Sequence, residues 1–129
     1  FVTSPQGKTL AFVAVHALPD AILLRSNPDG MESALAHLRK YGIFDDVQIE
    51  DSSAETGEFH VLGPEAAAWL EGAGATLPEE DDLASIETTA AGVRLLLVRE
   101  SPAGVPGFTV IALPIWKATG PACIFCSPL

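Results

Sequence analysis

The first residues of the chain show a hydrophobic pattern that predicts two consecutive strands. Residues 9–17 form an apolar run rich in β-branched side chains, which is typical of a mostly buried strand. The sequence Leu-Pro-Asp then makes a turn into a second apolar run at residues 21–25. We therefore expect two strands that are joined by a tight connection.

The next segment has the pattern of an amphipathic helix with a marked beginning and end. Asn27 is a favourable N-cap, Pro28 suits the first helical position, and Asp29 favours the positive end of the helix dipole. Basic residues in the last turn and Gly42 after it predict where the helix stops. Apolar residues recur between these ends at helical spacing, namely Met31, Ala34, Leu35, Leu38 and Tyr41.

The second half of the chain alternates strands with one short helix. Residues 46–51 alternate like an edge strand, and we expect residues 57–63 to be its partner. Residues 64–74 open with proline and an acid and predict a short helix. Two further strands are predicted at residues 93–100 and 107–114, on either side of a Pro/Gly-rich segment. Residues 115–129 have no clear period and form a tail of unclear origin. Hairpins mixed with two helices predict an α+β domain with an antiparallel sheet.

Composition and charge narrow the classes of partner. The chain has 129 residues, which fits one domain, and its 48% hydrophobic content is that of a globular protein. Its net charge of −10 comes without a basic cluster, so we expect no nucleic-acid partner. Because no apolar run approaches the length of a membrane span and none resembles a signal peptide, we expect no membrane association and a cytoplasmic protein.

The sequence Gly7-Lys8-Thr9 has the ending of a phosphate-binding P-loop. That loop also needs a glycine five positions before its Gly-Lys-Thr, so that backbone N–H groups can surround the phosphates. The corresponding residue here is Val2. Pro5 and Gly7 are instead typical turn residues. The segment is therefore predicted to be a hairpin turn.

The remaining chemical groups do not form a recognisable catalytic or metal-binding pattern. Cys123 and Cys126 supply half of a zinc site, and its other ligands would come from scattered histidines; we favour two small apolar side chains near a terminus. His16 and His60 lie in strands, where an imidazole usually finds a backbone partner, and His37 is expected in solvent. The acidic pairs at residues 45–46 and 50–51 and the acidic run 78–82 are adjacent in sequence, so their side chains diverge.

The order of several segments adds a resemblance to a known family. Residues 5–53, with the Gly-Lys turn, two strands and a helix that ends in "LRKY", resemble the folate-binding family of the glycine-cleavage T-protein (aminomethyltransferase). These residues resemble the YgfZ-type members of the family more than the T-protein itself. The YgfZ-type members are tied to the maintenance of iron–sulfur enzymes. The later "HVLGPEAAAWL" resembles the family's "ALQGPxAxxxL", and "VRLLLVRESPAGVPGFTVIALP" resembles its "VxxxRTGYTGExGFEIxVP". The likeness covers residues 1–114 and implies a folate-binding domain that is incomplete at its N-terminal side.

The resemblance also implies positions for a folate site. The family's folate-contacting aspartate falls on Ala11 or Phe12, and its asparagine falls on Asn27. The tyrosine of "GYTGE" falls on Pro102 and the glutamate of "GFEI" falls on Thr109. Both carboxylates of the family are thus replaced, and no catalytic residue is carried over. Three residues remain as implied folate contacts: Asn27, Arg99 and Phe108.

These observations leave three functional hypotheses. The leading one is a YgfZ-type, folate-binding-family protein that has lost the catalytic carboxylates and whose cofactor is tetrahydrofolate or a related folate. The first alternative is an active tetrahydrofolate-dependent aminomethyltransferase, which would need an aspartate from another part of the chain. The second alternative is a non-catalytic oligomerising or docking module, a possible homo-oligomer whose exposed sheet edges favour pairing.

Overall fold

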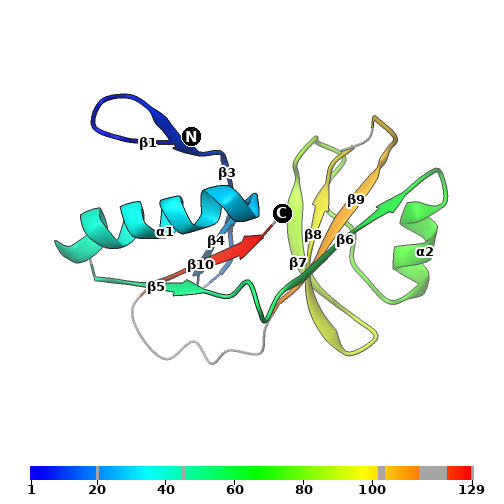
Figure 1. Cartoon of the computed structure of the whole chain (residues 1–129). Helices are drawn as coiled ribbons and strands as arrows, with labels where there is room; N and C mark the ends of the chain where they lie inside the picture. Colours follow the sequence, from blue (N-terminus) through cyan, green and yellow to red (C-terminus); the bar gives the residue numbers. More distant parts are fainter. Residues whose placement is uncertain (20, 45, 102–103, 114–121, 129) are drawn as a thin grey trace. The chain divides into compact units, whose positions relative to one another are not determined.

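The protein is described from a computed structural model (Figure 1). The described residues are 1–19, 21–44, 46–101, 104–113 and the backbone of 122–128. Within them the chain has an α+β architecture with two α-helices and three sheets, which confirms the fold class expected from the sequence. The chain divides into two compact units. Residues Phe1–Ala54 and Trp116–Leu129 form the first unit, and Glu55–Ile115 form the second.

The first unit opens with a small hairpin. Strand β1 (Val2–Thr3) pairs antiparallel with β2 (Thr9–Ala11). The N–H of Gly7 donates to the carbonyl of Ser4 at 2.8 Å, and the N–H of Ser4 donates to the carbonyl of Lys8 at 2.8 Å. Gly7 has φ of 79°, the left-handed conformation that glycine adopts in such three-residue hairpin loops. The prediction of a hairpin turn in place of a P-loop is confirmed.

A mixed four-stranded sheet follows in the first unit. β3 (Val13–Ala17) and β4 (Ala21–Ser26) form the expected antiparallel pair, although the predicted strand 9–17 is split at Phe12 into β2 and β3. β10 (Ala122–Pro128) lies between β4 and β5 (Val47–Asp51) and runs parallel to both. Residues 122–128 of the predicted tail therefore form a central strand of this sheet. The short apolar run of β10 is compatible with a buried parallel strand. It has no alternation of apolar and polar residues from which a strand could be predicted.

Helix α1 (Pro28–Tyr41) forms where the sequence predicted a helix, and it packs on this sheet. The 3₁₀ turn η1 (Gly42–Phe44) follows it. The buried face of α1 contributes Met31 and Leu35 to a core cluster with Leu24 of β4. Three partly buried side chains complete the cluster, namely Val13, Leu38 and Ile49. This packing fixes the start of α1 against the strands before it.

The second unit is an antiparallel sheet with a short helix. The strands are β6 (Gly57–Leu62), β9 (Gly107–Ala112), β8 (Val93–Arg99) and β7 (Ser85–Ala90), in that spatial order. Helix α2 (Ala66–Gly72) packs on the sheet through Ala66 and Leu70. The pairing expected between residues 46–51 and 57–63 is wrong, because β6 pairs with β9 and β5 pairs with β10. β7 was not predicted, since its mostly polar residues lie at a sheet edge where no apolar pattern is required.

Candidate functional site

A pocket of about 320 Å³ lies in the first unit, between β2 and the first turn of α1. Its volume is at the lower end of the usual range for small-molecule sites. Seven residues line it: Thr9, Leu10, Ala11, Phe12, Asn27, Asp29 and Gly30. The pocket therefore contains the positions to which the sequence resemblance assigned the family's aspartate and asparagine.

Ser26 joins the two sides of this pocket. Its hydroxyl is fully buried and donates a hydrogen bond of 2.8 Å to the carbonyl of Phe12. The Oδ1 atom of Asn27 lies 3.3 Å from the same hydroxyl oxygen. Because Phe12 follows β2 and Ser26 ends β4, this contact holds the residues around Phe12 beside the start of α1.

Asn27 occupies the N-cap position of α1, but its side chain makes no capping hydrogen bond. The backbone N–H groups of Gly30 and Met31 both donate to the carbonyl of Asn27 at 3.0 Å. The prediction that Asn27 is the N-cap is thus confirmed for its position and wrong for its side chain. The amide is instead turned toward Ser26 and Gly30 and lines the pocket.

Gly30 makes this arrangement of the Asn27 amide possible. A Cβ atom on Gly30 would lie 2.5 Å from Oδ1 of Asn27, 2.9 Å from Oγ of Ser26 and 3.2 Å from Cβ of Ala11. Ordinary van der Waals contacts of a Cβ begin at 3.4 Å. Glycine at this position is therefore required for the close approach of β2 and Asn27 to the helix.

The other walls of the pocket offer one aromatic ring and one carboxylate. The ring of Phe12 is 60% exposed and meets the ring of Phe1 edge-on, with the centroids 5.1 Å apart. Asp29 is exposed in the first turn of α1, where it also complements the helix dipole. Ala11 is buried and brings no polar group. The sequence interpretation treated Asp29 only as a helix residue, although its place two residues after Asn27 puts it in the same turn.

Arg99 and Phe108, the other two implied folate contacts, lie in the second unit and contact each other there. The guanidinium of Arg99 stacks over the ring of Phe108, 4.8 Å from its centroid. Arg99 also donates hydrogen bonds to the carbonyls of Glu79 at 2.7 Å and Pro78 at 3.1 Å. Phe108 is only 2% exposed and belongs to the core cluster under α2. Arg99 thus holds residues 78–79 near the sheet, and Phe108 packs against the Arg99 guanidinium. Ligand contact by either residue stays a prediction.

The histidines that the sequence singled out contact side chains. Arg25, which is 2% exposed, donates to Nε2 of His16 at 3.2 Å. In the second unit the hydroxyl of Thr109 donates to the carboxylate of Glu100, so Nδ1 of His60 donates to that hydroxyl at 2.8 Å. Both contacts are to side chains, and the expected backbone partners of His16 and His60 stay a prediction. The ring of His37, expected in solvent, is partly buried and lies 4.6 Å from that of Tyr41.

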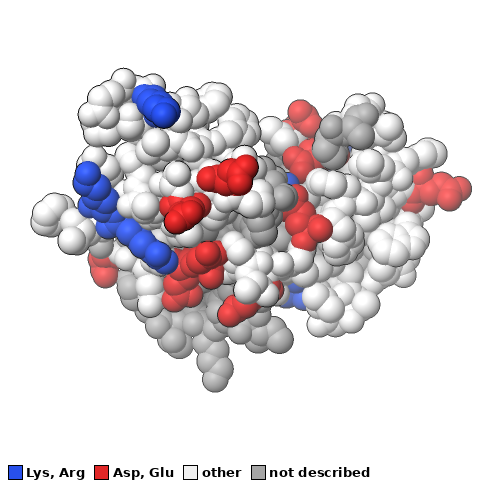
Figure 2. Space-filling view, in the orientation of Figure 1, with Lys and Arg blue, Asp and Glu red and all other residues white. Residues whose placement is uncertain are grey.

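The described residues hold no group of three or more His, Cys, Asp and Glu side chains that is placed to bind a metal ion. Cys123 and Cys126 belong to β10, and their side chains lie outside the described residues. Neither described helix is long and apolar enough to cross a membrane. On the face drawn in Figure 2, acidic side chains are spread over the described residues and basic ones are few.

Comparisons of the chain with protein-family models, with curated proteins and with solved structures find no match.

Proposed function

We propose that this chain is a folate-binding-family protein of the YgfZ type that binds the pterin ring of a reduced folate in the pocket at the start of α1. Two independent observations support the proposal. The sequence resemblance assigns folate contact to positions 11 or 12 and 27, and these positions line one pocket although 15 or 16 residues of sequence separate them. The observation that carries most weight is that the Asn27 amide lines this pocket and caps no helix.

The polar groups of the pocket match the chemistry of a pterin. A pterin presents N–H donors beside a carbonyl acceptor along one edge, and it has two flat faces. The Asn27 amide can donate to that carbonyl and accept from an N–H, and the Asp29 carboxylate accepts from the amino group and the ring N–H. The exposed ring of Phe12 offers a surface against which the pterin can stack. This fits a largely apolar pocket in which a few polar groups orient the ligand.

Aminomethyl transfer is the second candidate function, and Asp29 is the observation that favours it. A carboxylate beside the carbon being transferred would stabilise the iminium-like centre that develops there. Ala11 cannot supply that charge, whereas Asp29 borders the same pocket. The transfer activity would then depend on Asp29, and Asp29→Asn would abolish turnover even at a folate concentration that saturates the variant. A chain that binds folate and transfers no aminomethyl group supports the first proposal alone.

A calorimetric titration of 5-formyltetrahydrofolate into the purified chain tests the proposal. We expect saturable binding that Asn27→Ala weakens about fivefold to tenfold, because one neutral hydrogen bond contributes about 1 kcal/mol. Gln6→Ala is the matched control, since Gln6 is an exposed amide in the hairpin turn and does not line the pocket. Absence of binding at about millimolar ligand would refute folate binding. Equal affinity of Asn27→Ala and the unaltered chain would refute the site.

A further inference from the structure

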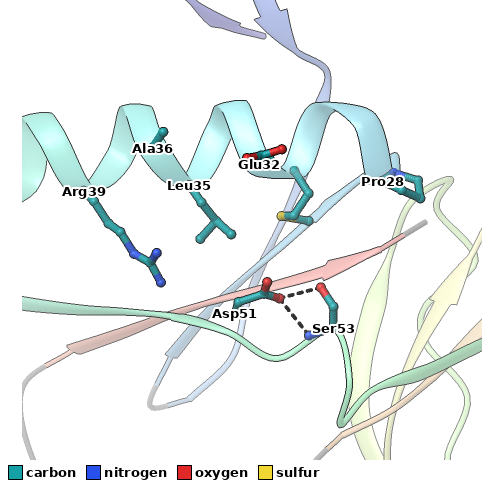
Figure 3. Close-up of a pocket in the computed structure, with 8 residues that line it drawn as sticks. Pro28, Glu32, Leu35, Ala36, Arg39, Asp51 and Ser53 are labelled. Atoms are coloured by element: carbon teal, nitrogen blue, oxygen red, sulfur yellow. Dashed lines mark hydrogen bonds between the residues drawn. The ribbon is translucent and has the colours of Figure 1, made fainter.

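A second cleft, of about 550 Å³, lies in the first unit between α1 and the end of β5 (Figure 3). It uses different residues of α1 from the pocket described above. Its lining residues are Pro28, Met31, Glu32, Leu35, Ala36, Arg39, Asp51 and Ser53. The lining includes both apolar and charged side chains, so the cleft combines a hydrophobic base with charged groups.

The hydrophobic base comes from the buried side of α1. Met31 and Leu35 are 5% and 7% exposed and pack against Leu24 in the core. They are therefore held by the fold whether or not a ligand is present. Pro28 and Ala36 extend the apolar surface along the helix. A ligand that lies in the cleft would place a small apolar group against these side chains.

Asp51 lies at one side of the cleft, where Ser53 donates two hydrogen bonds to its carboxylate. Its Oδ1 atom accepts hydrogen bonds from the hydroxyl of Ser53 at 2.5 Å and from the N–H of Ser53 at 3.0 Å. The bond from the Ser53 hydroxyl, then the bond from its N–H, and to a lesser degree the charge of Arg39, hold the pKa of Asp51 below its ordinary value. Both of these hydrogen bonds go to Oδ1, and among the described residues no side chain donates to Oδ2. Glu32 of α1 brings a second carboxylate to the cleft.

Arg39 brings the opposite charge to the same cleft. Figure 3 shows its side chain extending from α1 toward the strand that carries Asp51. Among the described residues, Arg39 has no ion pair within the 4.0 Å that defines a salt bridge. The guanidinium and the two carboxylates therefore line one cavity without neutralising one another by direct contact. A ligand with separated positive and negative groups could satisfy both sides at once.

We propose that this cleft binds the zwitterion of an amino acid with an apolar side chain. The carboxylate of the ligand pairs with the guanidinium of Arg39, which is suited to bidentate recognition of a carboxylate. The ammonium donates to Asp51, with Glu32 adding to the negative potential. The apolar side chain covers Met31 and Leu35. A simple anion such as phosphate is disfavoured here, because two carboxylates face the single arginine.

The test is a titration of the full chain with L-leucine and two analogues that each lack one charge. 4-Methylpentanoate lacks the amine, and 3-methylbutylamine lacks the carboxylate. NMR chemical-shift changes of the backbone amides of α1 and β5 report the binding. We expect each analogue to bind about fivefold more weakly than leucine, which is the effect of one partly exposed ion pair. Equal affinities of the three compounds, or no shift changes at about 10 mM leucine, overturn the proposal.

Charge-removing variants assign the two ends of the ligand. The Arg39→Gln variant should bind leucine no more tightly than it binds 3-methylbutylamine. The Asp51→Asn variant should bind leucine no more tightly than it binds 4-methylpentanoate. Lys40→Gln and Glu50→Gln are matched controls, because both residues are exposed neighbours that do not line the cleft. An equal loss in a control and its partner variant overturns the assignment. Asn27→Ala should leave leucine binding unchanged, which separates this site from the proposed folate site.

Discussion

The substitution Gly30→Ala tests whether the proposed folate site depends on the close approach of Asn27 to α1. It adds one methyl group at a position where a Cβ would lie 2.5 Å from Oδ1 of Asn27 and 2.9 Å from Oγ of Ser26. Both atoms belong to side chains and not to the backbone. The Asn27 side chain can rotate into solvent, whereas the Ser26 hydroxyl is buried and bonded to Phe12. We therefore expect the amide of Asn27 to leave the pocket.

The expected change in stability is small because two effects oppose each other. Replacing a helical glycine by alanine stabilises a helix by up to about 1 kcal/mol. Loss or distortion of the hydrogen bond from Ser26 to Phe12 costs about 1 kcal/mol. The free energy of unfolding should thus stay within about 1 kcal/mol of its original value. The affinity for 5-formyltetrahydrofolate should fall about fivefold to tenfold, as for Asn27→Ala.

Urea denaturation and calorimetric titration measure the two effects separately. Gly72→Ala is the matched control, since Gly72 is also helical and a Cβ there would meet no atom within 4 Å. It should leave folate binding unchanged. If Gly30→Ala binds folate as tightly as the original chain, the displaced amide is not a ligand contact and the reasoning fails. A loss of stability above about 3 kcal/mol would mean that the backbone moves and that side-chain rotation does not relieve the clash.

Two further predictions concern the core and the charged groups of the second cleft. Leu70→Ala should lower the free energy of unfolding by about 3 kcal/mol, because Leu70 is 2% exposed in the core of the second unit. Trp69→Ala is the control and should lower the free energy of unfolding far less, because Trp69 is 61% exposed. Equal losses of the two variants in urea denaturation would contradict this packing. The lowered pKa of Asp51 makes a contribution to stability that is present above its ordinary pKa of about 4 and is lost as the pH falls through the lowered value. The difference in unfolding free energy between the original chain and Asp51→Asn should therefore shrink below about pH 4, and a difference that is independent of pH would refute the contribution.

The local elements of this fold could be predicted from the sequence because their determinants lie within a few residues. Pro28, the acidic first turn and the spaced apolar residues define α1 without reference to any other part of the chain. Pro5 and Gly7 likewise define the first hairpin turn. In both places the local preference and the tertiary packing agree, and the predicted bounds lie close to those observed.

The pairing of strands that no short turn connects could not be predicted, because it depends on contacts between distant segments. β5 and β6 are consecutive and patterned alike, yet they belong to different sheets and pair with β10 and β9. The placement of β10 between β4 and β5 joins residues about 70 to 100 positions apart, and parallel strands need long connections that leave no turn signal. Nothing in the alternation of residues 46–51 or 57–63 distinguishes these partners.

The candidate site was predicted only in part. The sequence resemblance selected Asn27, whereas the residue pattern alone explained Asn27 as a helix cap. The cap bond is absent because the side chain lies against Ser26 and over Gly30, a contact that depends on where β2 packs. The cleft near Arg39 was missed for a related reason. The sequence analysis predicted no site at Asp51, because the side chains of the adjacent Glu50 and Asp51 diverge. Asp51 and Arg39 come to line one cleft only through the packing of α1 on β5.

The surroundings of Ala11 explain why the carboxylate of this pocket comes from α1. Ala11 is buried, and its Cβ lies only 3.2 Å from where a side chain on Gly30 would begin. A carboxylate at position 11 would be desolvated without room for the hydrogen bonds that it requires, and the exposed Asp29 would repel it. Asp29 borders the same cavity from a helix turn that is open to solvent, where a negative charge is also favoured by the helix dipole. The close contact between β2 and α1 therefore leaves room for the carboxylate of Asp29 on α1. It leaves no room for a carboxylate at position 11 on β2.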